Sequence, residues 1–264
     1  MKLRISHRTR YTYDGPVSYA LQRVRLSPQN CATQTVAAWT LAVDGAKEEV
    51  RFVDHFGNDT RLLSLSTGSN FMEIVASGEV DVRDTAGITG PHSGFAPLWL
   101  FKQDTPLTTP GPLIAEIAQR ATAKGDVERL HALSRGIGER VVYRVGATDA
   151  TTVAEDAVAR GEGVCQDHTH IFLAAARKLG FPARYVSGYL LLDETTEQVA
   201  SHAWAEAFVT GLGWVAFDVS NGISPDSRYV RVATGRDYRD AMPVSGIRTG
   251  QAQEQLDVLI TVEQ

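Results

Sequence analysis

The sequence predicts an α+β protein in which an all-β module precedes a core of helices packed on an antiparallel sheet. Residues from Met1 to about Asp84 form short alternating segments separated by turn residues, which is the pattern of half-buried strands. After Pro112 the apolar spacing changes to three or four residues, as in amphipathic helices. Strand-like segments return only after Gly180, so helices and sheet are separated along the chain, as in α+β and not doubly wound α/β folds.

The composition is that of a soluble globular protein. The 264 residues are 43% hydrophobic and 22% charged, with a net charge of -5. That charge, and the lack of any basic run of five or more residues, argue against a nucleic-acid surface. The N-terminus lacks the apolar region of a secretory signal, and no stretch has the roughly 18 apolar residues of a membrane span, so we expect no membrane partner.

The two cysteines, Cys31 and Cys165, lie in very different contexts. One long-range disulfide would fit the count, but we expect independent reduced thiols and a cytoplasmic protein. Cys31 lies in the polar segment "SPQNCATQ" and is expected to be an incidental thiol.

The chain divides into four predicted parts. Residues 1–90 form the β-rich module, an antiparallel sandwich or barrel punctuated by "DG" and "GN" turns. Residues 91–111 form a linker rich in proline and glycine that is expected to lie over a surface. Residues 112–246 form the core, and residues 247–264 a last strand whose sheet the sequence does not assign.

Three helices are predicted before the second cysteine. The first begins at Pro112, and apolar residues from Val127 to Val141 indicate the second. Thr152 and Glu155 have the spacing of a capping box, which predicts the start of the third.

A fourth helix follows Cys165 and is expected to end at Gly180, since Pro182 prevents its continuation. Cys165 therefore lies at or just before a first helical turn, where unpaired N–H groups and the helix dipole stabilise a thiolate. Cysteine is also a common buried apolar residue, and this position alone leaves both interpretations open.

A predicted hairpin supplies partners for this thiol. His202 begins the strand "HAWAEAFV", Asp218 ends the strand "GWVAFDVS", and "TGLG" forms the turn between them. Pairing positions whose numbers sum to about 420, such as Ala207 with Gly213, puts His202 beside Asp218, although a slip of one residue would separate them. An imidazole held by a carboxylate is basic enough to take a thiol proton, so the order is that of a papain-type triad. Taken singly, His202 could be a core histidine and Asp218 a turn residue.

Three segments of the core resemble the bacterial transglutaminase-like family: "GVCQDHTHIFLAAARKLGFPARYVSGYL", "SHAWAEAFVTGLGWVAFDVSNG" and "GRDYRDAMPVSG". "HRTRYTYDGPV", "RLSP" and "DHFGN" resemble the β-rich region that precedes the core in many members. The resemblance implies a papain-like core with Cys165 as nucleophile, His202 as base and Asp218 as its orienting partner. "DVSNG" stands where members often have "DPTNG", and "CQDHTH" carries two unusual histidines, which puts substrate preference in doubt more than activity.

A zinc site is the alternative use of the cysteine. Cys165 and His168 share a helix side and could bind Zn²⁺ together with His202, but His170 points elsewhere and there is no second cysteine pair. We therefore favour the triad, with no metal and no cofactor. Asp167 and His168 are expected to cap the helix and line the pocket.

Further candidates concern the oxyanion and the cleft. The backbone N–H of Cys165 and one other donor would hold the oxyanion, and the side chains of Gln166 and Tyr143 are candidates for that donor. Trp204 could form a wall of the cleft or fill the core.

The predicted chemistry is acyl transfer through a cysteine thioester on a peptide or protein amide. Resolution by water gives a peptidase or amidase, which the resemblance to bacterial members favours. Resolution by an amine gives a transglutaminase, and a third alternative is a catalytically silent peptide-binding module. The sequence leaves the oligomeric state open.

Overall fold

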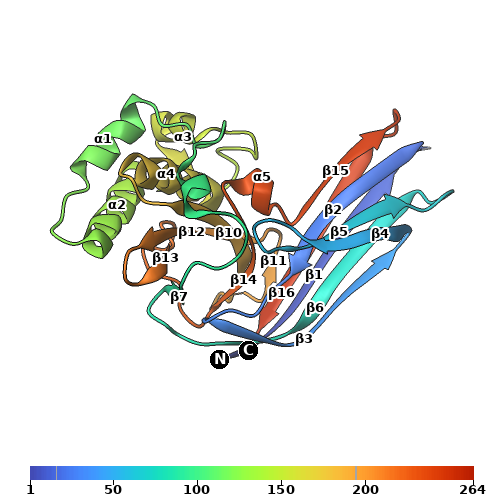
Figure 1. Ribbon diagram of the computed structural model, residues 1–264. Coiled ribbons are helices and arrows are strands. Elements are labelled where there is room, and N and C mark those ends of the chain that lie inside the picture. The colour runs from blue at the N-terminus through green and yellow to red at the C-terminus, as the bar shows by residue number, and fades with distance from the viewer. Residues whose placement is uncertain (16, 194) are drawn as a thin grey trace.

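The computed structural model describes residues 1–15, 17–193 and 195–264. It is an α+β structure, with helices gathered on one side and the long strands of the β-module on the other (Figure 1). None of the helices in these ranges is long and apolar enough to cross a membrane.

Two antiparallel sheets form the β-module. The first has the order β11-β16-β1-β6-β3 and the second the order β15-β2-β5-β4. The strands of the first sheet are β1 (Lys2–Tyr13), β3 (Gln34–Asp44), β6 (Phe71–Val82), β11 (Glu197–Gln198) and β16 (Glu254–Glu263). Those of the second are β2 (Tyr19–Ser27), β4 (Ala46–Val53), β5 (Asp59–Leu65) and β15 (Val244–Thr249). Alternate residues of β1 are buried, as the sequence pattern predicts, and Tyr11 packs with Val24, Leu63 and Met72 between the sheets.

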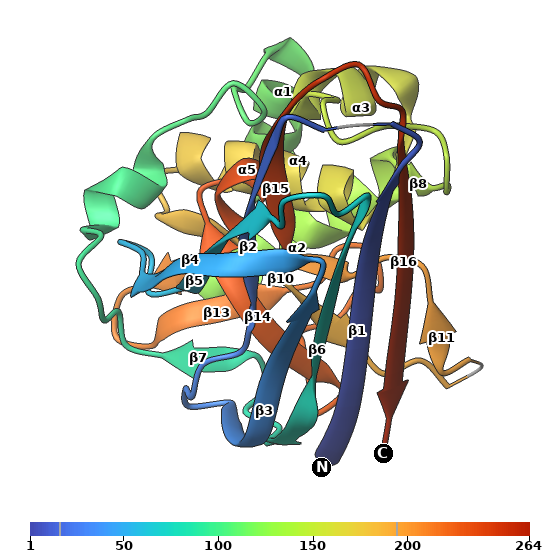
Figure 2. The same cartoon turned by 90° about the vertical axis from the view of Figure 1, so that its right-hand side faces the viewer.

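The end of the chain returns to the β-module. β15 pairs with β2, and β16 pairs with β1 along its whole length, from Arg4 opposite Glu263 to Tyr13 opposite Glu254 (Figure 2). The predicted last strand, "LDVLITVE", is β16, while residues 247–249 of the predicted C-terminal part end β15. Gly250, with φ of 138°, lies between the two strands. The boundary predicted at 246 also falls inside β15.

The core contains a five-stranded sheet with the order β14-β10-β12-β13-β7. Its strands are β7 (Ile88–Gly90), β10 (Ala183–Leu190), β12 (His202–Val209), β13 (Gly213–Phe217) and β14 (Tyr229–Gly235). The helices are α1 (Pro112–Arg120), α2 (Asp126–Arg140), α3 (Ala154–Arg160), α4 (Cys165–Lys178) and α5 (Tyr238–Ala241). Two short parallel strands, β8 (Val142–Tyr143) and β9 (Glu162–Gly163), lie between the helices.

The core sheet is buried on both faces. Buried alanines of β12 pack in one cluster with α4, and Phe172 of that helix stacks on Phe217 with ring centroids 5.1 Å apart. On the other side, Tyr189 and Val230 pack in one apolar cluster with Leu3 and Ile260 of the β-module. The β-module and the core therefore share a continuous apolar interface.

The segment predicted as a linker is anchored to the core. It contains a short 3₁₀ helix, η1 (Leu98–Lys102), whose buried Phe101 packs edge-on against Trp214 at 5.2 Å. The buried guanidinium of Arg177 on α4 donates hydrogen bonds to the Phe101 carbonyl and to Thr108. These contacts hold the segment against the sheet and α4.

The predicted capping box at the third helix is wrong. The carboxylate of Glu155 accepts hydrogen bonds from the backbone N–H groups of Gly111, Leu113 and Ile114, at the start of α1. Thr152 accepts from Asp149 instead of capping α3. The unpaired N–H groups and positive end of α1 provide Glu155 with more donors than its own helix would.

Candidate active site

Cys165 is the first residue of α4, as predicted. The chain enters the helix through Val164, whose N–H donates to Asp167 Oδ2 at 2.8 Å, so the predicted cap by Asp167 is confirmed. Thr148 donates to the same oxygen at 2.6 Å. A Cβ on Gly163 would lie 2.8 Å from the Asp167 Cβ, which explains the glycine at this tight entry.

The hairpin of β12 and β13 brings His202 to Asp218 in a register different from the predicted one. Ala207 lies opposite Val215, so paired numbers sum to 422 and not 420. Gly213 (φ 92°) pairs with Val209, which makes the connecting loop shorter than expected. A shift of two residues keeps each side chain on its face of the sheet, and the contact therefore survives. His202 Nε2 donates to Asp218 Oδ2 at 2.6 Å.

Asp218 is fully buried and receives several hydrogen bonds. Besides His202, the side chains of Asn221 and Tyr229 donate to Oδ2, at 2.7 and 2.8 Å, and the Asn221 N–H donates to Oδ1 at 3.2 Å. Burial alone would raise the pKa of Asp218, but these donors and the charge of His202 lower it below its usual value. The group is therefore a buried carboxylate that stays ionised.

His202 is held between this carboxylate and the thiol. Its side chain is 13% exposed and hydrogen-bonded to Asp218, and it lies near enough to Cys165 for the thiol to raise its pKa. Burial lowers its pKa, but Asp218 and Cys165 outweigh burial and raise that pKa to about 10. Since Nε2 binds Asp218, Nδ1 is the nitrogen that faces the sulfur.

Aromatic rings surround the histidine. Trp204 stacks against His202 with centroids 6.3 Å apart and meets Tyr229 edge-on at 5.5 Å. Trp204 is buried, so of its two predicted roles it fills the core beneath the imidazole. The sequence does not predict the role of Tyr229, because nothing local to a tyrosine at the start of a strand marks it as a partner of Asp218.

The two side chains predicted to hold the oxyanion lie beside the thiol. Burial raises the pKa of Tyr143, and the nearby charge of Cys165 raises it further. Gln166 follows Cys165 on α4 and is half-buried. Within residues 1–15, 17–193 and 195–264, neither side chain has a hydrogen-bond partner, so both stay predictions as oxyanion donors.

His168 does not complete a zinc site. Its Nε2 donates to the Val141 carbonyl at 2.9 Å and its Nδ1 contacts Ser220 Oγ at 2.8 Å, while burial lowers its pKa. Both ring nitrogens are used, and the buried ring ties α4 to neighbouring loops instead of lining an open pocket. His170 Nε2 accepts from the Tyr238 N–H. Among the described residues, no group of three or more His, Cys, Asp or Glu side chains could hold a metal.

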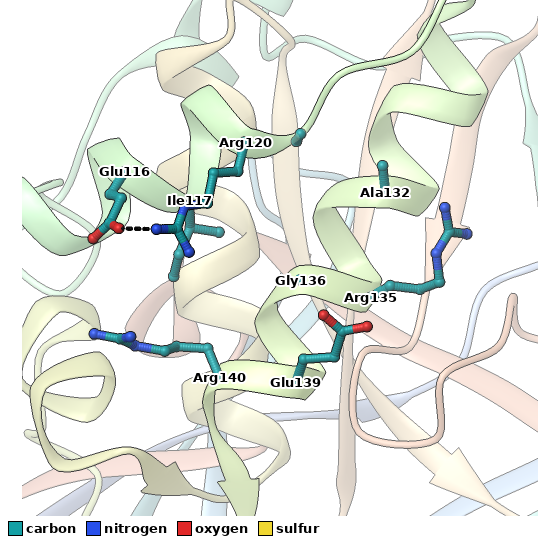
Figure 3. Close-up of a pocket in the computed structure, with 9 residues that line it drawn as sticks. Glu116, Ile117, Arg120, Ala132, Arg135, Gly136, Glu139 and Arg140 are labelled. Atoms are coloured by element: carbon teal, nitrogen blue, oxygen red, sulfur yellow. Dashed lines mark ion pairs between the residues drawn. The ribbon is translucent and has the colours of Figure 1, made fainter.

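A hollow of about 260 Å³ lies between α1 and α2, away from Cys165 (Figure 3). Its walls carry arginines and glutamates, including the ion pair of Arg120 with Glu116 at 2.6 Å. None of the described residues that line it is a cysteine, serine or histidine. This hollow therefore offers no nucleophile, and the candidate site is the one around Cys165.

The fold and the residues around Cys165 define a transglutaminase-like protein. Residues 114–219 match the model of the transglutaminase-like superfamily core, and this range contains Cys165, His202 and Asp218. Residues 3–81 match the bacterial transglutaminase-like N-terminal region. The chain belongs to the bacterial transglutaminase-like family, and the predicted resemblance is confirmed.

Relatives of similar length exist in mycobacteria. An uncharacterized protein of Mycobacterium leprae is 29% identical over 276 residues, which cover 99% of this chain and 98% of that one. One from Mycobacterium tuberculosis is 29% identical over 291 residues, covering 99% and 92%. A solved structure of a candidate cysteine protease from Cytophaga hutchinsonii aligns with a TM-score of 0.78 at 23% identity, over 100% of this chain and 91% of that chain. It shares the fold of both the β-module and the core.

Proposed function

We propose that the protein is a cysteine peptidase or amidase that acts through a thioester on Cys165. The observation that carries this proposal is the position of His202, which is hydrogen-bonded to the buried Asp218 and whose pKa is raised by both Asp218 and Cys165. The family and its candidate cysteine protease neighbour support a cysteine-based enzyme.

The reaction begins from the ion pair formed when the Cys165 thiol has given its proton to His202 Nδ1, a transfer that the raised pKa of His202 favours. The thiolate attacks the amide carbonyl carbon, and the carbonyl oxygen becomes an oxyanion held by the Cys165 N–H and by Gln166 or Tyr143. The carbon–nitrogen bond then breaks as the imidazolium donates its proton to the leaving amine. Water, deprotonated by His202, attacks the thioester and releases a carboxylic acid and the thiol.

Asp218 acts through the histidine. Because its pKa is lowered, its charge persists while His202 is protonated, and it stabilises that imidazolium. The hydrogen bond from Nε2 also fixes the ring so that Nδ1 points to the sulfur. In this role Asp218 is a positioning residue that never touches the substrate.

Alkylation by iodoacetamide at mildly acidic pH tests the nucleophile. We expect Cys165 to be labelled much faster than Cys31, a half-buried thiol beside Thr33 that serves as the internal control. Hydrolysis of a peptide amide should disappear in Cys165→Ala and persist in Cys31→Ala. Equal slow labelling of both thiols would favour the catalytically silent peptide-binding module.

Amine transfer is the competing reaction, since the family is defined by its likeness to transglutaminases. Incubation with a glutamine peptide and a labelled primary amine separates the two. We expect ammonia and glutamate from hydrolysis. Incorporation of the amine that is lost in Cys165→Ala would instead establish a transglutaminase.

A cytoplasmic location is part of the proposal. Cys31 and Cys165 are both free thiols, which suits a reducing compartment. Fractionation of cells that produce the protein would test this, and recovery outside the cytoplasm would contradict it.

A further inference from the structure

A pocket of about 180 Å³ lies between the β-module and the core, close to the candidate site. Figure 1 shows α5 between the helices of the core and the strands of the β-module, and Tyr238 of α5 lines this pocket. One wall comes from β1 and β16, through Thr9, Leu256 and Val258, and the facing wall from the core, through Val199, Ser201 and Tyr238. Neither half of the molecule forms the pocket alone.

The core wall adjoins both reacting side chains. Ser201 directly precedes His202 at the start of β12. Tyr238 begins α5 and packs against the same apolar cluster as Cys165, and its pKa is raised by burial and by the charge of Cys165. Tyr238 is also fixed in place, because its N–H donates to His170 at 3.1 Å and its ring packs against Tyr185. The pocket therefore lies next to the residues that would carry the reaction.

The walls carry no charge. No Asp, Glu, Lys or Arg is among the described residues that line the pocket. The one titratable base, His7, binds Tyr189 through Nδ1 at 2.9 Å and Thr9 through Nε2 at 3.1 Å, and burial lowers its pKa to about 4. At neutral pH the ring is uncharged, so a charged substrate group would lose its hydration here without gaining a counter-charge.

The size and rim of the pocket fit one apolar side chain. An apolar cavity of about 150 Å³ is large enough to hold benzene, so this pocket can hold an aromatic or branched aliphatic group. Leu256 and Val199 leave 52% and 82% of their surface in water at the rim, although both are apolar. Covering them with a substrate side chain would be favourable.

We propose that this pocket binds an uncharged apolar side chain next to the amide that Cys165 attacks, so that the β-module is a specificity element of the site. The proposal rests on the proposed function, since it takes Cys165 as the nucleophile. It assigns the substrate class as peptides with a large aliphatic or aromatic residue beside the cleaved bond.

Alkylating peptide ketones that differ only in one side chain provide the test. Each carries a chloromethyl ketone that reacts with Cys165, and the variable residue is Phe, Leu or Asp. We expect the Phe and Leu reagents to label Cys165 at least about tenfold faster than the Asp reagent. Leu256→Asp should remove most of this preference but leave labelling by plain iodoacetamide unchanged.

Leu259→Asp is the matched control. Leu259 is an exposed leucine of the same strand that lies on the opposite face and does not line the pocket. Its variant should keep the wild-type preference. Fast iodoacetamide labelling without any preference between Phe and Asp reagents would overturn the pocket proposal and leave the nucleophile intact.

Binding measured without chemistry keeps the two proposals separable. Calorimetry with an uncharged Phe-containing peptide should give weaker binding to the Cys165→Ala, Leu256→Asp protein than to Cys165→Ala alone, by roughly tenfold. Equal affinities would refute the pocket whatever the reactivity of Cys165. Slow iodoacetamide labelling with unequal affinities would refute the proposed catalysis and support the pocket.

Discussion

The substitution Asp218→Asn removes the buried charge beside His202 while keeping the shape of the side chain. Three donors meet at Oδ2, from His202, Asn221 and Tyr229, and one backbone N–H meets Oδ1. An asparagine can place its oxygen toward the three donors, and its amide group then faces the backbone N–H of Asn221. The cost of that one unsatisfied contact is about 1–3 kcal/mol, so the variant should fold with reduced stability.

The larger effect is on the charge of His202. Its pKa of about 10 exceeds the usual 6.5 by roughly 3.5 pH units, or about 5 kcal/mol in favour of the imidazolium after the opposing effect of burial. Because this pKa is raised, the stabilisation is complete below pH 6.5 and is lost as the pH rises through about 10. In the variant, burial still disfavours the imidazolium, but the negative charge of Asp218 that stabilised it is gone. The pKa of His202 should fall by more than one pH unit.

The assay is kcat/KM for a peptide amide as a function of pH. The wild type should lose activity only as the pH approaches about 10, since the imidazolium must protonate the leaving amine. In Asp218→Asn this alkaline decline should move toward neutral pH, and the maximal rate should fall by at least about 100-fold. Asp226→Asn, at a partly exposed ion pair with Arg228, is the control and should change neither. An alkaline decline that stays in place in Asp218→Asn would refute the assignment.

Three further substitutions probe the supports of the site and the core. Tyr229→Phe removes one hydrogen-bond donor to Asp218. In steady-state kinetics it should lower kcat about threefold to tenfold and leave KM unchanged. An unchanged kcat would argue against the role of the phenol. Glu206→Gln leaves two largely buried arginines without their carboxylate partner. In urea unfolding it should lower the free energy of unfolding by about 3–5 kcal/mol, and a decrease below about 1 kcal/mol would contradict this. Glu155→Ala removes the acceptor at the start of α1 and should lower the free energy of unfolding by about 1 kcal/mol in the same experiment. An unchanged free energy of unfolding would show that Glu155 does not stabilise this helix start.

Local patterns predicted the parts of the structure that local forces determine. The alternation in β1 and the entry of the chain into α4 at Cys165 depend on neighbours in sequence, and both match the structure. The meeting of His202 and Asp218 also follows from the sequence, although the predicted register was displaced by two residues. It survives that error because the two faces of a strand repeat every second residue.

Long-range contacts could not be predicted in the same way. Tyr229 reaches Asp218 only because β14 pairs with β10, and Glu155 caps a helix that begins 43 residues earlier in the chain. Such pairings depend on which surfaces the folded sheets bring together, and no spacing rule in the sequence encodes them. The pocket between the β-module and the core is of this kind, since one wall joins strands from both ends of the chain and the other comes from residues 199–238.

The pairing of β16 with β1 makes the core an insertion within the β-module. Arg4 and Glu263 are neighbours in a sheet although 258 residues separate them, so this ladder can form only after the entire core has been synthesised. The core is thus free to fold first, and its folded surface then serves as a template for the module that encloses it. Removal of residues 1–90 would not release an independent core, since β15 would lose its partner β2 and β16 would keep only the short β11, which leaves open edges prone to aggregation.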